Sequence, residues 1–170
     1  MNNFASKWVQ FCINSVDKSK GIALDLACGK GRHSTFLEKI GFKVIAVDNT
    51  SSNFSFFSGK NILKIYKDVE CLQNWPIYEK KFDVIVVTKF LNRSIFPKII
   101  SSLKKGGYLI YETFSEGHEK IGSPRNPDYI LRSKELILLC KPLSLIAFEE
   151  VQSINYDNGY IMQRILSKNV

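Results

Sequence analysis

The chain has 170 residues, enough to enclose a full hydrophobic core, and we expect a single domain over residues 1–170. Its 45% hydrophobic and 24% charged residues are ordinary for a globular protein, and its apolar runs are too short to cross a bilayer. The N-terminal residues lack the basic start and apolar core of a secretory signal, so we expect a cytoplasmic protein that does not bind membranes.

The formal net charge of +8 raises the question of a nucleic-acid partner. The lysines are spread along the chain, the longest clusters are the pairs at 80–81 and 104–105, and no arginine-rich arm is present. Nucleic-acid binding is therefore the less favoured interpretation. Four scattered cysteines without a C-x-x-C pair predict free thiols, with no disulfide framework and no metal site: Cys12, Cys28, Cys71 and Cys140.

Apolar runs alternate with helical patterns along the chain. Phe4, Trp8, Phe11, Cys12 and Ser15 lie at helical spacing, which predicts an amphipathic helix within residues 1–20. Strands are predicted at 22–26, 42–48, 61–68, 82–87 and 108–114. Helices are predicted at 32–40, 51–59, 93–104 and 133–140, and a long polar loop at 115–132.

The C-terminal part has a different pattern. Residues 143–152 and 159–167 read as two strands joined by a turn containing Asp157, Asn158 and Gly159, which is an antiparallel hairpin signal. The preceding alternation of strands and helices predicts an α/β fold with a parallel sheet and helices on both faces. The hairpin adds one antiparallel strand to this sheet.

Acidic residues follow each of the first three predicted strands: Asp25, Asp48 and Asp68. Ligands of open α/β sheets bind at the carboxyl ends of the strands, although Asp is also common there because it favours turns and helix starts. Gly29 and Gly31, between the first two acids, expose backbone N–H groups just before the helix expected to begin at Arg32. The sequence therefore predicts a nucleotide-like ligand at this edge.

A dinucleotide site would require G-x-G-x-x-G, but Ser34 stands at the third glycine position. Asp25, directly before the turn, would repel a pyrophosphate and attract a cationic group. S-adenosylmethionine combines an ammonium, a carboxylate, a ribose diol and an adenine, and so fits better. We expect Asp25 near its amine, Asp48 on both ribose hydroxyls and Asp68 on the adenine amine.

The stretch "LDLACGKGRHSTFLEKIGFKVIAVD" resembles the cofactor half of class I S-adenosylmethionine-dependent methyltransferases. The family pattern Asp-x-Gly-x-Gly-x-Gly falls on Asp25, Ala27, Gly29 and Gly31, with Ala27 replacing the first glycine. "GGYLIYETFSEGHEKIGSPRNPDYILRSKEL" and the terminal "MQRI" are similar to small bacterial methyltransferases near the tellurite-resistance type. This resemblance implies a Rossmann-like, seven-stranded, mostly parallel sheet in the order 3-2-1-4-5-7-6, with strand 7 antiparallel.

The predicted cofactor site is completed by residues that flank these positions: Ala27, Cys28, Arg32, His33, Asn49, Val69 and Thr88. We expect His33 and the N-terminal helix to cover the cofactor pocket, with core packing as the alternative for the helix. S-adenosylhomocysteine would be the product form of the cofactor.

Acceptor-binding residues are expected after the fourth and fifth strands. The catalytic candidates are Glu112, Arg93 and Tyr111; for Glu112, a carboxylate in a buried run, the alternative is an ion pair with Arg125 or Arg132. The substrate-binding candidates are Phe90, Asn92, Phe114, Arg125, Asn126 and Arg132. His118, in the long loop, is either an acceptor-site residue or a surface residue.

We therefore expect methyl transfer from S-adenosylmethionine to a small-molecule acceptor. A general base is needed only if the acceptor carries a proton at attack. "TKFLN" after strand four lacks the Asn/Asp-Pro-Pro-aromatic motif, which argues against amino methylation of bases or glutamine. RNA or protein methylation, and a non-catalytic nucleotide-binding or scaffold role, are the alternatives.

Overall fold

A computed structural model describes residues 4–17, 20–70, 81–153 and 159–170. One seven-stranded sheet runs in the order β3-β2-β1-β4-β5-β7-β6. The strands are β1 (Gly21–Leu26), β2 (Phe42–Asp48), β3 (Ile62–Tyr66), β4 (Phe82–Thr88), β5 (Leu103–Phe114), β6 (Ser144–Ser153) and β7 (Tyr160–Lys168). Strand β7 runs antiparallel to both of its neighbours, β5 and β6, so the predicted strand order and the direction of strand 7 are confirmed. The predicted turn residues Asp157 and Asn158 lie outside the described residues.

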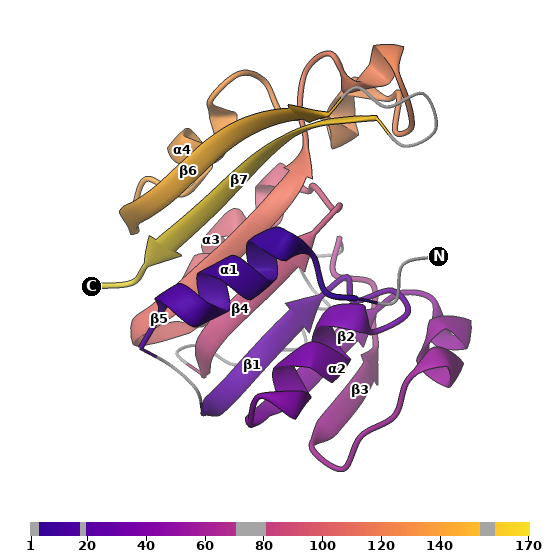
Figure 1. Cartoon of the computed structure of the whole chain (residues 1–170), viewed down its shortest axis with the longest axis vertical. Coiled ribbons are helices and arrows are strands. Elements are labelled where there is room, and N and C mark those ends of the chain that lie inside the picture. Colours follow the sequence, from indigo (N-terminus) through magenta and orange to yellow (C-terminus); the bar gives the residue numbers. More distant parts are fainter. Residues whose placement is uncertain (1–3, 18–19, 71–80, 154–158) are drawn as a thin grey trace.

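Helices cover both faces of this sheet (Figure 1). Helices α1 (Lys7–Ser15) and α2 (Arg32–Lys39) lie on one face, and the shorter α3 (Phe96–Ser101) and α4 (Glu135–Leu139) lie on the other. Strand residues alternate between two apolar cores, because successive side chains of a strand point to opposite faces. Within the described segments, no helix combines the length and apolarity needed to cross a membrane.

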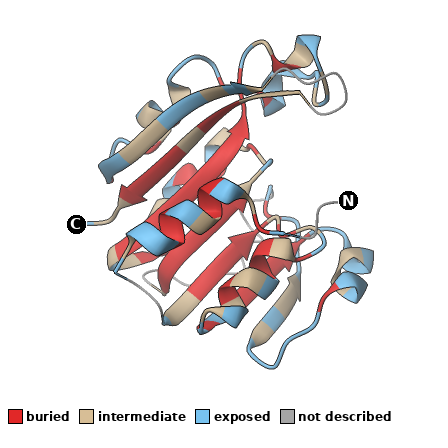
Figure 2. Cartoon of the chain, in the orientation of Figure 1, coloured by how far each residue is buried: buried red, intermediate tan, exposed pale blue. Residues whose placement is uncertain are grey.

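Burial is concentrated in the central strands (Figure 2). Leu24, Ile85 and Leu109 belong to the core under α3 and α4, whereas Ala23 and Val84 belong to the core under α1 and α2. The edge strands β3 and β6 are largely exposed or half-buried. The continuous apolar sequences of β1 and β4 therefore reflect burial on both faces.

The start of β5 differs from the sequence prediction, because the strand begins at Leu103 rather than at Tyr108. Leu103 pairs with Phe82 and Tyr108 pairs with Val84, so the residues between Leu103 and Tyr108 bulge opposite Asp83. The Asp83 carboxylate accepts hydrogen bonds from the Ile22 N–H (2.9 Å) and from Lys104 Nζ (2.8 Å). The predicted helix over 93–104 is therefore too long.

Three other predicted segments are shorter in the structure. The 3₁₀ helices η1 (Ser51–Phe56) and η3 (Arg93–Ile95) replace parts of longer predicted helices, and α4 covers only Glu135–Leu139. Strand β3 ends at Tyr66, so Asp68 lies beyond the strand end. At η3, a local side-chain cap favours the short turn, because Asn92 Oδ1 accepts from the Ser94 N–H at 3.0 Å.

Ala27 occupies a backbone conformation that favours glycine. Its φ is 53°, in the left-handed region, and Gly29 and Gly31 in the same turn also have positive φ. A left-handed conformation costs a non-glycine residue roughly 1–2 kcal/mol. The replacement of the family glycine by Ala27 is therefore accommodated with strain.

Ala27→Gly should raise the free energy of unfolding by about 0.5–1 kcal/mol. Glycine removes the strain of the left-handed conformation, which costs alanine roughly 1–2 kcal/mol. This gain exceeds the extra conformational entropy that glycine loses on folding, which costs roughly 0.5–1 kcal/mol. Urea unfolding of both proteins measures this difference through the transition midpoint. A lower midpoint at unchanged slope would contradict it.

Candidate functional site

A pocket with a volume of ≈ 540 Å³ opens at the carboxyl ends of the parallel strands. It is lined by Ala27, Cys28, Gly29, Lys30, Arg32, His33, Thr35, Phe56, Phe57, Thr88 and Lys89. The predicted cofactor residues in the glycine turn, in the first turn of α2 and at the end of β4 therefore meet in one cavity. We call this cavity the glycine-turn pocket.

The glycine turn is shaped by what surrounds its two glycines. No atom lies within 4 Å of the position of a Cβ on Gly29, so a ligand can lie directly against the backbone there. A Cβ on Gly31, in contrast, would collide with the Phe57 ring. Lys64 Nζ donates to the carbonyl oxygens of Phe54 (2.7 Å) and Phe57, which fixes the segment that carries this ring.

Asp48 holds the glycine turn against the segment that follows β2. Its Oδ2 accepts from the Gly29 N–H at 2.7 Å, and its Oδ1 accepts from the Thr50 N–H (2.9 Å) and Asn53 Nδ2 (3.1 Å). A carboxylate offers about four acceptor positions, so three are already used. One acceptor position remains open in this structure, and the expectation that Asp48 accepts both ribose hydroxyls stays a prediction.

Asp25 is buried behind the turn, with an exposed fraction of 1%. Its Oδ2 accepts a hydrogen bond from Ser34 Oγ at 2.5 Å, and burial raises its pKa from 3.8 to about 7. Asp25 does not line the glycine-turn pocket. In this structure the carboxylate anchors the first turn of α2 through Ser34, and its expected place near a ligand ammonium stays a prediction.

His33 connects the N-terminal helix to the pocket. Its Nε2 accepts from the Ser6 N–H at 3.2 Å, and Ser6 caps α1 by accepting from the Val9 N–H at 3.1 Å. Its Nδ1 lies 3.4 Å from Thr88 Oγ1 at the end of β4. Burial lowers the pKa of His33 from 6.5 to about 3, so the ring is neutral near pH 7. His33 lines the glycine-turn pocket, whereas α1 packs Trp8 and Val9 into the core on its face of the sheet, which is the alternative expected for this helix.

Two cations of the glycine-turn pocket, Arg32 and Lys89, make no side-chain hydrogen bond or ion pair within the described parts of the chain. Both are therefore available to an anionic ligand group. Asn49, Asp68 and Val69 do not line this pocket. Asn49 and Asp68 are exposed, whereas Val69 is buried in the apolar core.

A second cavity, of ≈ 330 Å³, adjoins the end of β4. It is lined by Lys89, Phe90, Leu91, Phe114, Ser123, Pro124 and Tyr129, and we call it the aromatic chamber. Phe90 and Phe114 were both predicted to bind the acceptor. His118 is buried rather than at the surface: it stacks on Phe114 with ring centroids 4.1 Å apart, and its Nε2 lies 2.9 Å from the Ser123 carbonyl oxygen.

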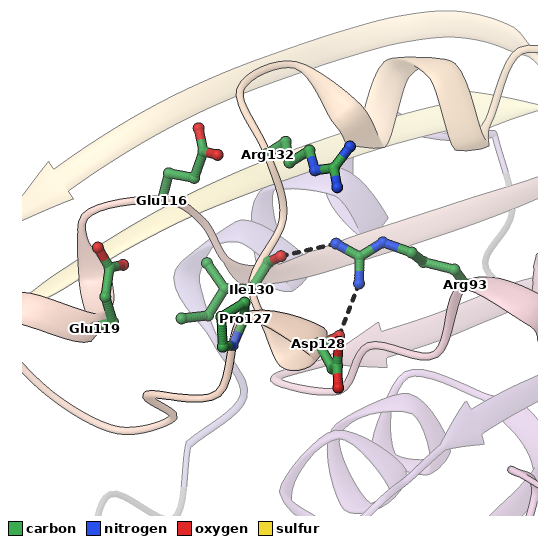
Figure 3. A pocket seen from close by; sticks show the side chains of 7 residues that line it. All are labelled: Arg93, Glu116, Glu119, Pro127, Asp128, Ile130 and Arg132. Atoms are coloured by element: carbon green, nitrogen blue, oxygen red, sulfur yellow. Dashed lines mark hydrogen bonds between the residues drawn. The ribbon is translucent and has the colours of Figure 1, made fainter.

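Arg93 organises the long loop through hydrogen bonds that use all three of its nitrogens. It donates to Glu135 at 2.7 and 2.9 Å, to the Asp128 carbonyl oxygen at 2.7 Å and to the Ile130 carbonyl oxygen at 2.8 Å. Figure 3 shows its guanidinium at one side of a further pocket, with the Glu116 and Glu119 carboxylates at the other. The guanidinium lowers the pKa of Glu135. Arg93 thus connects the start of α4 to the loop before it, and its catalytic role stays a prediction.

Tyr111 is fully buried and stacks on Phe96 with ring centroids 5.1 Å apart. Its hydroxyl donates to the Phe90 carbonyl oxygen at 2.7 Å, and burial raises its pKa well above 10. The hydroxyl is thus neutral and engaged, and it fixes the backbone of a chamber residue. The expected catalytic role of Tyr111 is not supported by this arrangement.

The remaining loop candidates do not converge on one site. Asn92 and Asn126 cap short helices through their Oδ1 atoms, which accept from the Ser94 and Asp128 N–H groups. Arg132 lines the pocket of Figure 3, and Arg125 has an exposed side chain. The predicted clamp of Arg125, Asn126 and Arg132 is therefore not formed.

Glu112 is buried and faces Arg164 across the β5–β7 pair, with Oε2 3.3 Å from Nε. Arg164 also approaches Glu149 of β6 at 3.8 Å, so one cation lies between two carboxylates on three adjacent strands. The alternative of an ion pair was right in kind, but its partner is neither Arg125 nor Arg132. Glu112 lines neither the glycine-turn pocket nor the aromatic chamber.

Sequence reasoning missed Lys89, which lies between the predicted residues Thr88 and Phe90. It also missed Lys30, Thr35, Phe56 and Phe57 in the glycine-turn pocket and Leu91, Ser123, Pro124 and Tyr129 in the chamber. Lys89 directly follows a buried strand, and this position could have marked it as a ligand-binding candidate from the sequence. No sequence signal marks its φ of 54°.

Comparisons with known proteins identify the family. The model of the tellurite resistance protein TehB family matches residues 8–139, and the chain therefore belongs to this family. A probable S-adenosyl-L-methionine-dependent methyltransferase TehB from Haemophilus influenzae is 33% identical over 110 residues, which cover 55% of this chain and 37% of that protein. The chain thus spans less than half the length of this curated relative.

Solved structures show the same fold. The crystal structure of TehB from Haemophilus influenzae superposes with a TM-score of 0.78 at 21% identity, and the match covers 95% of this chain and 62% of that one. A SAM-dependent methyltransferase from Methanosarcina mazei superposes with a TM-score of 0.76 at 17% identity, covering 93% and 96% of the two chains. These matches agree with the predicted Rossmann-like fold of class I methyltransferases.

Arg164→Met should lower the free energy of unfolding by about 3–5 kcal/mol, because it leaves the buried Glu112 carboxylate without its cation. The double variant Glu112→Gln/Arg164→Met should recover most of this loss. Urea unfolding of the wild type, both single variants and the double variant gives the coupling free energy. Additive effects would contradict a buried ion pair.

Asp25 and His33 should have opposite effects on stability between about pH 4 and 6.5. Asp25 has a raised pKa in the folded chain, so its contribution is present at low pH and is lost as pH rises through about 7. His33 has a lowered pKa, so its contribution is present above 6.5 and is lost as pH falls toward about 3.

The unfolding free energy of Asp25→Asn, relative to wild type, should therefore rise with pH across this window, and that of His33→Gln should fall. Each slope should approach about 1.4 kcal/mol per pH unit. Urea unfolding at half-unit pH steps measures both differences. Parallel profiles for the three proteins would contradict the assignment of these two groups.

Proposed function

We propose that this TehB-family chain is an S-adenosylmethionine-dependent methyltransferase whose acceptor is a small molecule. The observation that carries the proposal is the glycine-turn pocket at the carboxyl ends of the parallel strands. It combines open backbone at Gly29, which the adjacent Asp48 carboxylate holds in place, with Arg32, which forms no ion pair within the described residues. Its volume of ≈ 540 Å³ suits a ligand of nucleoside size.

The residues present fit this cofactor. Gly29 allows the ligand to lie against the chain, because nothing fills the place of its Cβ. Arg32 would bind the carboxylate of the methionine part as a charge-assisted pair. Asp48 keeps one acceptor position for a ribose hydroxyl, and the exposed Asn49 and Asp68, beyond β2 and β3, are the groups that would approach the adenine from outside the pocket.

The bound cofactor supplies an electrophilic methyl group, so the chain mainly has to align an acceptor and exclude water. The Arg93 guanidinium forms an ion pair with Glu135, and the Glu112 carboxylate forms one with Arg164. The Tyr111 hydroxyl donates to the Phe90 carbonyl oxygen. These groups would position the chamber walls instead of moving protons. None of these three residues would act as a general base.

The acceptor site is the aromatic chamber. It shares Lys89 with the glycine-turn pocket, and its walls include Phe90 from the segment after β4 and Phe114 from the end of β5. The volume of ≈ 330 Å³ suits a small molecule and not a folded macromolecule. The segment 115–132, which provides Ser123, Pro124 and Tyr129, would cover the acceptor.

Asp48→Asn should weaken binding of S-adenosylhomocysteine by about tenfold to a hundredfold, since it removes charged hydrogen bonds to Gly29 and to the ribose. Titration calorimetry measures the affinity. Asp17→Asn, at an exposed acid outside the pocket, is the charge-matched control and should bind like wild type.

The 2′-deoxy and 3′-deoxy forms of the ligand separate direct contact from positioning. If Asp48 binds a ribose hydroxyl, loss of that hydroxyl should weaken binding to wild type and change it little in Asp48→Asn. Equal losses in both proteins would leave Asp48 as a positioning residue only. No binding of S-adenosylhomocysteine to the wild type would overturn the proposed function.

A further inference from the structure

Lys89 occupies the junction between the two cavities. Among the described residues, it alone lines both the glycine-turn pocket and the aromatic chamber. It directly follows β4, which ends at Thr88 at the carboxyl edge of the sheet. Its side chain therefore lies where a cofactor in one cavity would meet an acceptor in the other.

The backbone of Lys89 is held in a costly conformation. Its φ is 54°, and its N–H donates to the Glu112 carbonyl oxygen at 2.9 Å. A non-glycine residue in the left-handed region costs on the order of 1–3 kcal/mol and persists where the surroundings fix it. Such residues cluster at functional sites, which makes Lys89 a candidate independently of the pocket geometry.

The ammonium of Lys89 has no anionic partner of its own. Its Nζ makes no hydrogen bond or ion pair within the described segments and lies 5.8 Å from the centre of the Phe114 ring. Glu112, whose charge acts on it, is already paired with Arg164. Partial burial and the nearby Arg32 lower the pKa of Lys89, so an anion beside it would gain a strong interaction.

The chamber around this cation has aromatic walls, and two of its wall residues are held in place by further contacts. Phe90, Phe114 and Tyr129 contribute rings to its wall. Phe114 is fixed by its stack on His118, and the backbone of Phe90 is fixed by the Tyr111 hydroxyl. The volume of ≈ 330 Å³ lies at the low end for ligand cavities, which suits a molecule with one ring.

We propose that the aromatic chamber binds a single-ring aromatic acceptor as its anion, with the charge on the oxygen or sulfur that accepts the methyl group, and that Lys89 holds this atom. The proposal rests on the proposed function. A lysine at the junction would repel the positive charge of a sulfonium, and an acceptor anion between the two cations removes this repulsion.

The charge balance agrees with this placement. The acceptor anion forms one bond to the methyl carbon, the carbon–sulfur bond of the donor breaks, and its electron pair stays on the sulfur. The acceptor and donor both become neutral, and no proton is released because the acceptor was already ionised. Lys89 stays protonated throughout and acts by binding.

4-Nitrophenol tests the proposal without turnover, because its absorbance distinguishes the phenol from the phenolate. The probe is titrated with pH in the presence of protein saturated with S-adenosylhomocysteine. Bound to the wild type, its pKa should fall by about one unit, which corresponds to a tenfold preference for the anion. Lys89→Met should raise the pKa above that of the free phenol, since the aromatic chamber then disfavours charge.

Lys89→Arg should retain most of the pKa shift of the phenol. The control Lys105→Met makes the same charge change at an exposed residue near the start of β5, far along the strand from Phe114, and should behave like wild type. An unchanged or raised pKa on the wild type would overturn the proposal, even if Lys89→Met fails to fold. Competition by 4-nitrobenzoate as strong as that by the phenolate would overturn the assignment of the charge to the acceptor atom.

The two proposals fail separately. Absence of S-adenosylhomocysteine binding to the wild type counts against the proposed function. Normal binding of that ligand together with an unshifted phenol pKa counts only against the role of Lys89. Weakened affinity of 4-nitrophenol for Lys89→Met, with unchanged affinity for the neutral 4-nitrotoluene, would support the proposal.

Discussion

The hydrogen bonds of the Asp48 carboxylate hold together the edge of the sheet on which the site is built. Asp48 closes β2 and accepts from Gly29 in the turn after β1 and from Thr50 and Asn53 in the segment after β2. Two loops from neighbouring parallel strands are thereby joined through one side chain. Together with the Cys28 N–H, which donates to the Val47 carbonyl oxygen at 3.0 Å, it sets the open backbone at Gly29 relative to Phe57, whose ring occupies the space beside Gly31.

The sequence predicts most of the fold because its central strands are continuous apolar runs and its turns carry Gly and Asp. These signals are local, and so they place β1, β2 and β4 within a residue or two. The start of β5 is different, because it depends on Asp83 receiving donors from Ile22 and Lys104, residues distant in sequence. A pattern along the chain does not contain that contact.

The site shows the same division. The position of Asp48 and of the glycines follows from their place after strands, whereas the partners of buried polar residues do not. From the sequence, Glu112 is a candidate catalytic carboxylate, but in the structure it pairs with Arg164. Arg93 is likewise a candidate free cation in the sequence, but its N–H groups donate to Glu135 and to two loop carbonyl oxygens. A buried charge requires a partner, but sequence does not say whether that partner is a ligand or the chain itself.

The pairing of these charges determines which groups are left to act. Because Arg164 neutralises Glu112 and Glu135 engages Arg93, Arg32 and Lys89 are the cations of these two cavities that form no hydrogen bond or ion pair with the described parts of the chain. These two cations are 57 positions apart in the sequence, and both line the glycine-turn pocket. In a chain of net charge +8 their positive charges repel each other unless an anion lies between them. A ligand that brings a carboxylate to one and an anion to the other satisfies both, whereas a ligand with only positive charge satisfies neither. The electrostatics of the pocket therefore favour a donor that carries its own carboxylate and an acceptor that arrives ionised.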